Sequence, residues 1–284
     1  MKGFTGLNGS EKENRREDHF FDIAAGSVLI ALVAGMALLS LAYMPYDYNA
    51  MDNEQRFLSP GQSHLLGTDN FGRDVFSRIM AGARYTLMTA LLTVTGSAIL
   101  GTVTGLASGY SGGLPDEAVM RLMDIISSFP GILFALAMAA LLGGGEGTLI
   151  VSLLILFIPG FTRISRSGAL EYKNRDFVLL VRLQGASHGR IILRHILPNL
   201  VPNILSAVVL GLSNAIMAEA SMSYLGLGIQ PPVPSWGRML SESQNFLFNA
   251  PWCALAPGLF IMLTVIAFHT LGEGLKRRYS AGRL

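Results

Sequence analysis

Charged side chains are scarce in this sequence, because Asp, Glu, Lys and Arg make up only 14% of its 284 residues. Soluble domains carry about 25% charged residues. Apolar residues account for 51% of the chain instead. This balance excludes an ordinary soluble domain and predicts an all-α integral membrane protein.

Cysteine is nearly absent as well. Cys253 is the single cysteine of the sequence, which excludes a disulfide within the chain. The formal net charge is only +2, and the basic residues lie beside the apolar segments. We therefore expect no nucleic-acid partner.

The motifs of enzymes are also missing. No pair of the five histidines has metal-ligand spacing on one helix, and no nucleophile elbow is present. The glycine-rich run 143–147 lacks the Lys-Ser/Thr of a phosphate loop, and no strand precedes it. The sequence therefore predicts no catalysis and no cofactor or metal bound by this chain, so any ATP would be bound by a different chain.

Long uncharged intervals divide the sequence. They are 23–46, 85–115, 125–145, 147–162, 196–218 and 243–272. A helix needs about 20 residues to cross a bilayer, and five of these intervals are long enough. The short fourth interval can extend past Arg163, since that side chain can snorkel to the membrane surface. The sequence predicts six transmembrane helices.

The basic residues predict the orientation of these helices. Lys and Arg near membrane segments are retained on the cytoplasmic side. With both termini inside, all but five of the 21 Lys and Arg residues are cytoplasmic; the exceptions are Arg56, Arg73, Arg78, Arg84 and Arg238. We therefore expect the termini and residues 163–200 in the cytoplasm, with 45–84 and 226–250 outside.

Three regions follow from this arrangement. Residues 1–20 are polar and of mixed charge, which predicts a poorly ordered cytoplasmic tail. Residues 21–84 hold the first crossing and an external loop, and residues 85–284 form a core of five crossings. The last part of the external loop, Asp74 to Leu87, has helical periodicity. It predicts an amphipathic helix at the outer surface, with Val75, Ile79 and Gly82 on one face and Arg73, Ser77 and Arg84 off that face.

Small residues recur every four positions along the second crossing. They are Thr89, Thr93, Ser97, Gly101, Gly105 and Gly109. Such a stripe lies on one face of a helix and lets another helix approach closely. It predicts either packing within the chain or a gate or subunit interface.

Two acidic residues are candidates for the pathway or its gate. Glu219 follows 23 uncharged residues, and charged residues within a membrane usually face a cavity or a partner. Glu219 either lies at the pathway or its hinge, or is a hydrogen-bonded partner at a helix end. Asp124, with its neighbour Met123, begins the third crossing, where a carboxylate also suits a helix N-terminus.

The longest basic segment runs from Thr162 to Asn203, between two apolar segments. It contains Arg163, Arg166, Lys173, Arg175, Arg182, Arg190 and Arg194. Its pattern predicts short helices around a glycine turn at 183–190, closing with Leu197-Pro198. A structured cytoplasmic loop of this kind indicates a docking site for a soluble partner.

This loop resembles the signature loop of ATP-binding-cassette (ABC) importer permeases, in which Glu-Ala-Ala is followed by a Gly and later by Leu-Pro. Gly185 and Leu197-Pro198 match, whereas Leu179-Leu180-Val181 stand in place of Glu-Ala-Ala. Further motifs resemble the second, C-type subunit of peptide and nickel importer permeases. They are Leu66-Gly67-Thr68-Asp69, Gly72-Arg73-Asp74, Gly82-Ala83-Arg84, Arg175-Asp176-Phe177-Val178, Arg194 to Asn199, Ser223 to Gly228 and Pro234-Ser235-Trp236-Gly237.

The resemblance implies a type I importer permease fold with a cytoplasmic coupling helix. It also implies a prokaryotic inner (plasma) membrane and four kinds of partner: a second homologous permease, two ATPases that use the ATP, an external substrate-binding protein and membrane lipid. The residues it assigns to coupling are Gly185, Ala186, Ser187, His188, Arg190, Arg194 and Pro198. Arg190 and Arg194 can alternatively bind anionic lipid headgroups.

The sequence leaves the identity of the cargo open. Dipeptides, oligopeptides, nickel or other metal complexes and opine-like solutes all use permeases that this sequence resembles. No cluster of His, Cys or Met marks a metal path, and the 13 methionines are scattered. A non-transporting membrane receptor or scaffold subunit is the alternative from a different functional class.

Overall fold

The computed structural model describes residues 9–281, and the side chains of residues 22–279. Within these residues the chain is helical and has no β-strand. The long helices are α1 (Gly9–Ala42), α2 (Val75–Ser111), α3 (Gly113–Ser128), α4 (Gly131–Leu142), α5 (Glu146–Tyr172), α8 (Leu197–Tyr224) and α10 (Trp252–Ala281). The short ones are η1 (Asn53–Gln55), α6 (Asp176–Leu183), α7 (His188–Ile191), the π-helical η2 (Ile192–Ile196), α9 (Trp236–Ser243) and η3 (Gln244–Phe246).

The prediction of six membrane crossings is confirmed, although one crossing has an unexpected shape. Five helical segments of the described chain are long and apolar enough to span a membrane; they include α1, α2, α5, α8 and α10. The helices α3 and α4 pass the same test together, but they meet at an angle of 90°. The bend lies at Phe129 and Pro130, and proline cannot donate the hydrogen bond that would continue a helix.

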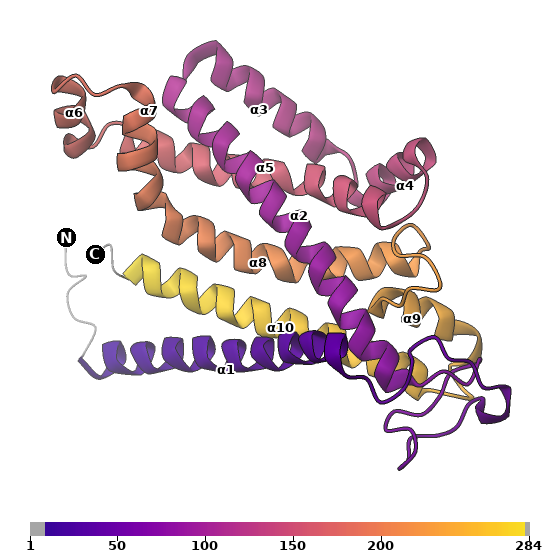
Figure 1. The fold of residues 1–284 in the computed structure, drawn as a ribbon. Helices are drawn as coiled ribbons and strands as arrows, with labels where there is room; N and C mark the ends of the chain where they lie inside the picture. Colours follow the sequence, from indigo (N-terminus) through magenta and orange to yellow (C-terminus); the bar gives the residue numbers. More distant parts are fainter. Residues whose placement is uncertain (1–8, 282–284) are drawn as a thin grey trace, which may run out of the picture.

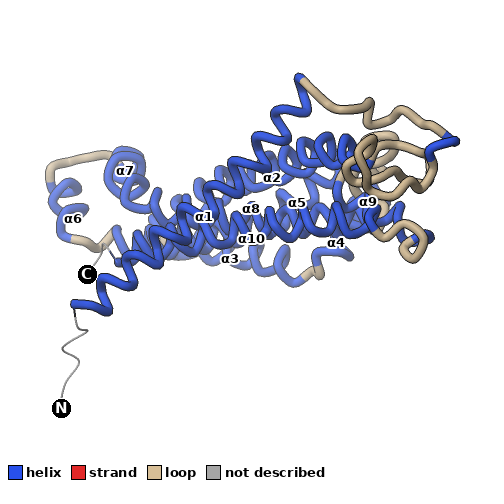
Figure 2. Tube along the Cα trace, turned by 90° about the horizontal axis from the view of Figure 1, so that it is seen from below, coloured by secondary structure: helices blue, strands red, loops and turns tan. Residues whose placement is uncertain are grey.

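The helices form an elongated bundle with different structures at its two ends. Figure 1 shows α6 and α7 at one end, and α9 with the loop that follows α1 at the other. The first turns of α1 and the last turns of α10 lie at the α6 end, where Asp22 and Arg277 form an ion pair of 3.5 Å. Figure 2 shows that the longest loops gather at the α9 end. The start of α1, the end of α10 and the α6–α7 region thus share one end of the bundle.

Two sequence predictions need correction at helix starts. The helix α1 begins at Gly9, so residues 9–20 are helical rather than a poorly ordered tail, while residues 1–8 lie outside the described residues. The expected separate surface helix after Asp74 is wrong, since α2 runs without a break from Val75 to Ser111. Arg73 and Ser77, which the periodicity set off the apolar face, are both buried.

The small-residue stripe of α2 packs within the chain, against α5. A Cβ atom added to Gly101 would lie 2.6 Å from the Phe161 Cβ, and one added to Gly109 would lie 2.7 Å from the Arg166 carbonyl oxygen. The hydroxyl of Ser97 donates a hydrogen bond of 2.8 Å to the Leu154 carbonyl across the same contact. The two backbones therefore touch almost directly, as small residues allow. The interpretation as intrachain packing is the one that the structure supports.

Candidate functional site

The loop between α5 and α8 is folded as the sequence predicts, with short helices around a glycine turn. The helix α6 ends at Leu183, and Gly185 adopts φ +81° in the left-handed region. The amide of Gly185 donates to the Arg182 carbonyl at 3.0 Å, and the amide of Ala186 donates to the Val181 carbonyl at 3.3 Å. These bonds satisfy carbonyl groups that the end of a helix leaves unpaired. Glycine occupies this turn because a side chain disfavours positive φ.

An apolar underside attaches this loop to the bundle. One buried cluster contains Leu106, Ala169, Val178, Ile191, Ile196 and Leu200, which come from α2, α5, α6, α7, η2 and α8. Val178 and Ile191 are fully buried. The position of α6 and α7 is therefore set by burial of apolar surface against three long helices.

Tyr110, at the end of α2, joins both short helices to the bundle. Its hydroxyl accepts a hydrogen bond of 3.1 Å from the Arg182 guanidinium and lies 3.0 Å from the His188 Nδ1 atom. The guanidinium also lies over the tyrosine ring, at 5.7 Å from its centroid. Sequence reasoning missed Tyr110, because the pattern of α2 does not show that residues more than 70 positions later along the chain lie beside it.

The outer face of the loop carries basic and apolar side chains. Of the predicted coupling residues, Gly185, Ser187, His188, Arg190, Arg194 and Pro198 are exposed, and Ala186 is half-buried. Leu179 and Leu180, which stand in the place of the expected Glu-Ala-Ala motif, are exposed too. The side chain of Leu183, at the end of α6, is 85% exposed. Apolar side chains exposed at the tip of a rigid element mark an interaction surface.

The pathway candidates on α3 differ from one another. Met123 is buried, with 4% of its surface exposed. Asp124 is exposed and forms an ion pair of 3.0 Å with Arg163 of α5. The Arg163 guanidinium also donates to the Ser127 hydroxyl at 3.1 Å. The structure therefore brings Asp124 together with a charge of the long basic segment.

Glu219 lies in a closed environment in α8. Its side chain is fully buried, and it accepts a hydrogen bond of 2.7 Å from the Ser223 hydroxyl. The same hydroxyl accepts from the Ile229 amide at 3.3 Å, and Thr86 and Ser235 lie beside the carboxyl. The Ser223 hydroxyl thus links Glu219 to the turn that follows α8. This placement favours the helix-end partner over direct contact with a cargo.

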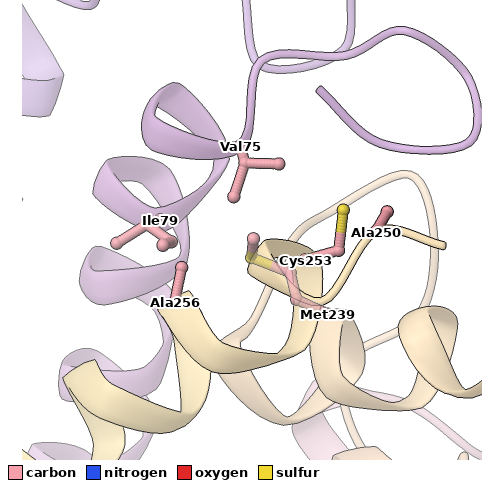
Figure 3. Packing of buried hydrophobic residues seen from close by; sticks show 6 residues of the cluster. All are labelled: Val75, Ile79, Met239, Ala250, Cys253 and Ala256. Carbon is pink, nitrogen blue, oxygen red and sulfur yellow. The ribbon is translucent and has the colours of Figure 1, made fainter. Parts of the chain in front are cut away.

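The α9 end holds a buried ion network that the sequence did not predict. Glu242 of α9 pairs with Arg73 at 3.2 Å and with Arg78 at 3.0 Å, and Arg73 also pairs with Asp69 at 2.7 Å. The arginine side chains are only 5% and 2% exposed. Beside this network, side chains from α2, α9 and the start of α10 form an apolar cluster, shown in Figure 3. The loop between α1 and α2 is therefore an ordered cap on the bundle.

The described residues contain no group of three His, Cys, Asp or Glu side chains that could hold a metal ion. Polar side chains of these residues instead form ion pairs between helices, such as Asp22 with Arg277 and Asp124 with Arg163.

Comparisons with known proteins give the family. A model of the family described as binding-protein-dependent transport system inner membrane component matches residues 101–281. The dipeptide transport system permease protein DppC of Alkalihalophilus pseudofirmus is 39% identical over 254 residues, covering 89% of this chain and 82% of that protein. The glutathione transport system permease protein GsiD of Pectobacterium atrosepticum is 40% identical over 255 residues, covering 89% and 84%.

A solved structure matches the fold. The permease-fold chain in an inward facing conformation of the MetNI methionine ABC transporter aligns with a TM-score of 0.60 over 72% of this chain and 95% of that chain, at 18% identity. The described residues have the type I importer permease fold that the sequence predicts. The chain belongs to the binding-protein-dependent transport system inner membrane components, and it is a permease component of an ABC importer.

Proposed function

We propose that this chain is one of two different permease subunits in a peptide importer and forms half of its translocation pathway. Two cytoplasmic ATPases supply the energy, and an external binding protein delivers the cargo. The observation that carries this proposal is the α6–α7 loop, which is rigidly held by Tyr110 and a buried apolar cluster yet exposes its outer face. Such a surface fits a soluble partner that pushes on the bundle.

Peptides are the cargo that the relatives support best. The two relatives described above are named for dipeptide and glutathione transport, and both cover most of this chain. Glutathione is itself a small peptide with free carboxylate and ammonium groups. We therefore place small peptides with charged ends ahead of nickel complexes and opine-like solutes.

Reconstitution of the complete importer in proteoliposomes tests the proposed function. The chain, the second permease, the ATPases and the binding protein together should take up a labelled dipeptide in an ATP-dependent manner. Omitting this chain, or supplying a non-hydrolysable ATP analogue, should abolish uptake. A complex that binds the loaded binding protein but never takes up peptide would instead support the receptor or scaffold alternative.

The orientation is part of the proposal, with the termini and the α6–α7 loop in the cytoplasm. The excess of basic residues at that end of the bundle supports it. In a Cys253→Ser background, His188→Cys should resist a membrane-impermeant thiol reagent added to intact cells, whereas Gln62→Cys in the exposed external loop should react. Labelling of the cysteine at position 188 from outside would contradict the proposed orientation.

A further inference from the structure

Two ion pairs join α3 to α5, and they differ in character. Arg166 binds Asp116 through two parallel hydrogen bonds of 2.6 and 2.7 Å, and the Asp116 side chain is only 10% exposed. Arg163 binds Asp124 through a single contact of 3.0 Å, and these side chains are 47% and 65% exposed. The first pair is closed and bidentate, a geometry typical of structural pairs. The second pair is open to an incoming group.

The open pair joins two segments of the membrane bundle. Both α5 and the bent α3–α4 pair qualify as membrane spans. A charged side chain in the middle of a span costs about 2.5–3.5 kcal/mol on insertion scales, and such residues face a cavity or a partner. The Arg163 and Asp124 side chains are therefore expected to face a cavity, a partner or the membrane surface.

An apolar groove lies on the same face of α5 as Arg163. It has a volume of about 360 Å³ and is lined from α4, α5 and α8 by residues that include Leu156, Phe157 and Ser221. Leu156 precedes Arg163 by seven residues, which is two helical turns, so both side chains lie on the same face of α5. The groove thus lies on the face of α5 that also carries Arg163, two helical turns away from the open ion pair.

We propose that Asp124, Arg163 and Ser127 form a cargo-contacting site on the wall of the translocation pathway, specific for the charged ends of small peptides. This inference rests on the proposed function of peptide import. A peptide carboxylate binds the Arg163 guanidinium and its ammonium group binds Asp124, so the cargo replaces each partner of the internal pair. The exchange leaves no charge unpaired, because a zwitterionic peptide supplies one charge of each sign. The closed pair of Asp116 and Arg166 holds α3 against α5 meanwhile.

Uptake by the reconstituted importer tests this site. Asp124→Asn and Arg163→Gln should each lower uptake of a dipeptide with free ends by about tenfold per assembled complex, as expected for loss of one hydrogen bond to a charged group. Uptake of an end-blocked peptide, chosen because the binding protein binds it equally well, should change less than twofold. Glu117→Gln is the matched control, since Glu117 forms an exposed pair with Arg121 on the same helix.

A double variant that exchanges the two charged residues distinguishes a cargo site from a structural ion pair. If Asp124 and Arg163 serve only to pair with each other, the double variant Asp124→Arg with Arg163→Asp restores uptake of both peptides, which would overturn the inference. Equal loss of uptake for free and end-blocked peptides would overturn it too. If the wild-type importer takes up no peptide at all, the proposed function fails instead.

Accessibility gives an independent test. In a Cys253→Ser background, Ser127→Cys in the assembled importer should react with a hydrophilic, membrane-impermeant thiol reagent supplied from the cytoplasmic side, and cargo during turnover should slow the reaction. Val28→Cys is the matched control, since Val28 is 60% exposed on the outer face of α1 and should stay unreactive in lipid. An unreactive cysteine at position 127 would mean that the second permease covers this surface, and the inference would fall.

Discussion

Replacing Gly185 by arginine is expected to abolish peptide uptake while the chain still inserts into the membrane. Gly185 adopts φ +81°, so any ordinary side chain strains the turn between α6 and α7. A Cβ atom there would meet nothing within 4 Å in this chain, so the substitution creates no internal clash. The charge would instead face the proposed ATPase groove. Uptake and copurification of the ATPases with the chain measure the effect.

A second substitution at this position separates the two causes. Asparagine tolerates positive φ better than other residues with a side chain. Gly185→Asn should therefore retain the turn, and if it restores coupling, backbone conformation is the requirement at 185. If it fails like arginine, close approach of the partner is the requirement. Normal uptake by Gly185→Arg would show that residues 183–190 are not the docking element.

Replacing Glu242 by alanine is expected to lower the free energy of unfolding by about 3 kcal/mol, the range for breaking a buried ion pair. Glu242 serves Arg73 and Arg78 together, and its removal leaves both arginines with Asp69 as their remaining carboxylate in the network. The measurement is thermal unfolding of the purified protein in detergent. Proteolysis of the external loop should also become faster, because that loop is held to α9 through this network.

The matched control lies in the same external loop. Glu54 is exposed and takes no part in the described ion pairs, so Glu54→Ala should leave the unfolding midpoint unchanged. If Glu242→Ala unfolds at the wild-type temperature, the network contributes nothing to the attachment of the loop. Glu242→Gln would then be expected to behave like wild type as well.

The sequence predicts most of the membrane architecture because the cost of a charge in lipid leaves long uncharged intervals. It does not predict the 90° bend between α3 and α4, since an uncharged interval records length and composition but no direction. It also misplaces Arg73, which the periodicity sets off the apolar face but which is buried in the fold. Its partner Glu242 lies 169 residues later, and only the folded chain brings them together.

In the coupling region, too, local features could be predicted from the sequence and long-range contacts could not. The turn at Gly185 follows from local chemistry, and the structure places it as predicted. The contact of Tyr110 with Arg182 and His188 joins residues more than 70 positions apart, so spacing within one helix cannot reveal it. The open pair of Asp124 and Arg163 is a third example, because each residue is an ordinary helix charge in its own segment.

The direct contact between the backbones of α2 and α5 limits how this permease can move. At Gly101, Gly105 and Gly109, α2 contributes no side chain to the contact that could change rotamer and let the helices slide. The pair is therefore expected to behave as one stiff lever, roughly 55 Å long along α2. A displacement applied to α6 and α7 would tilt this lever as a unit. Alternating access in this subunit would then be a rotation of a rigid body, with the pivot set elsewhere in the bundle.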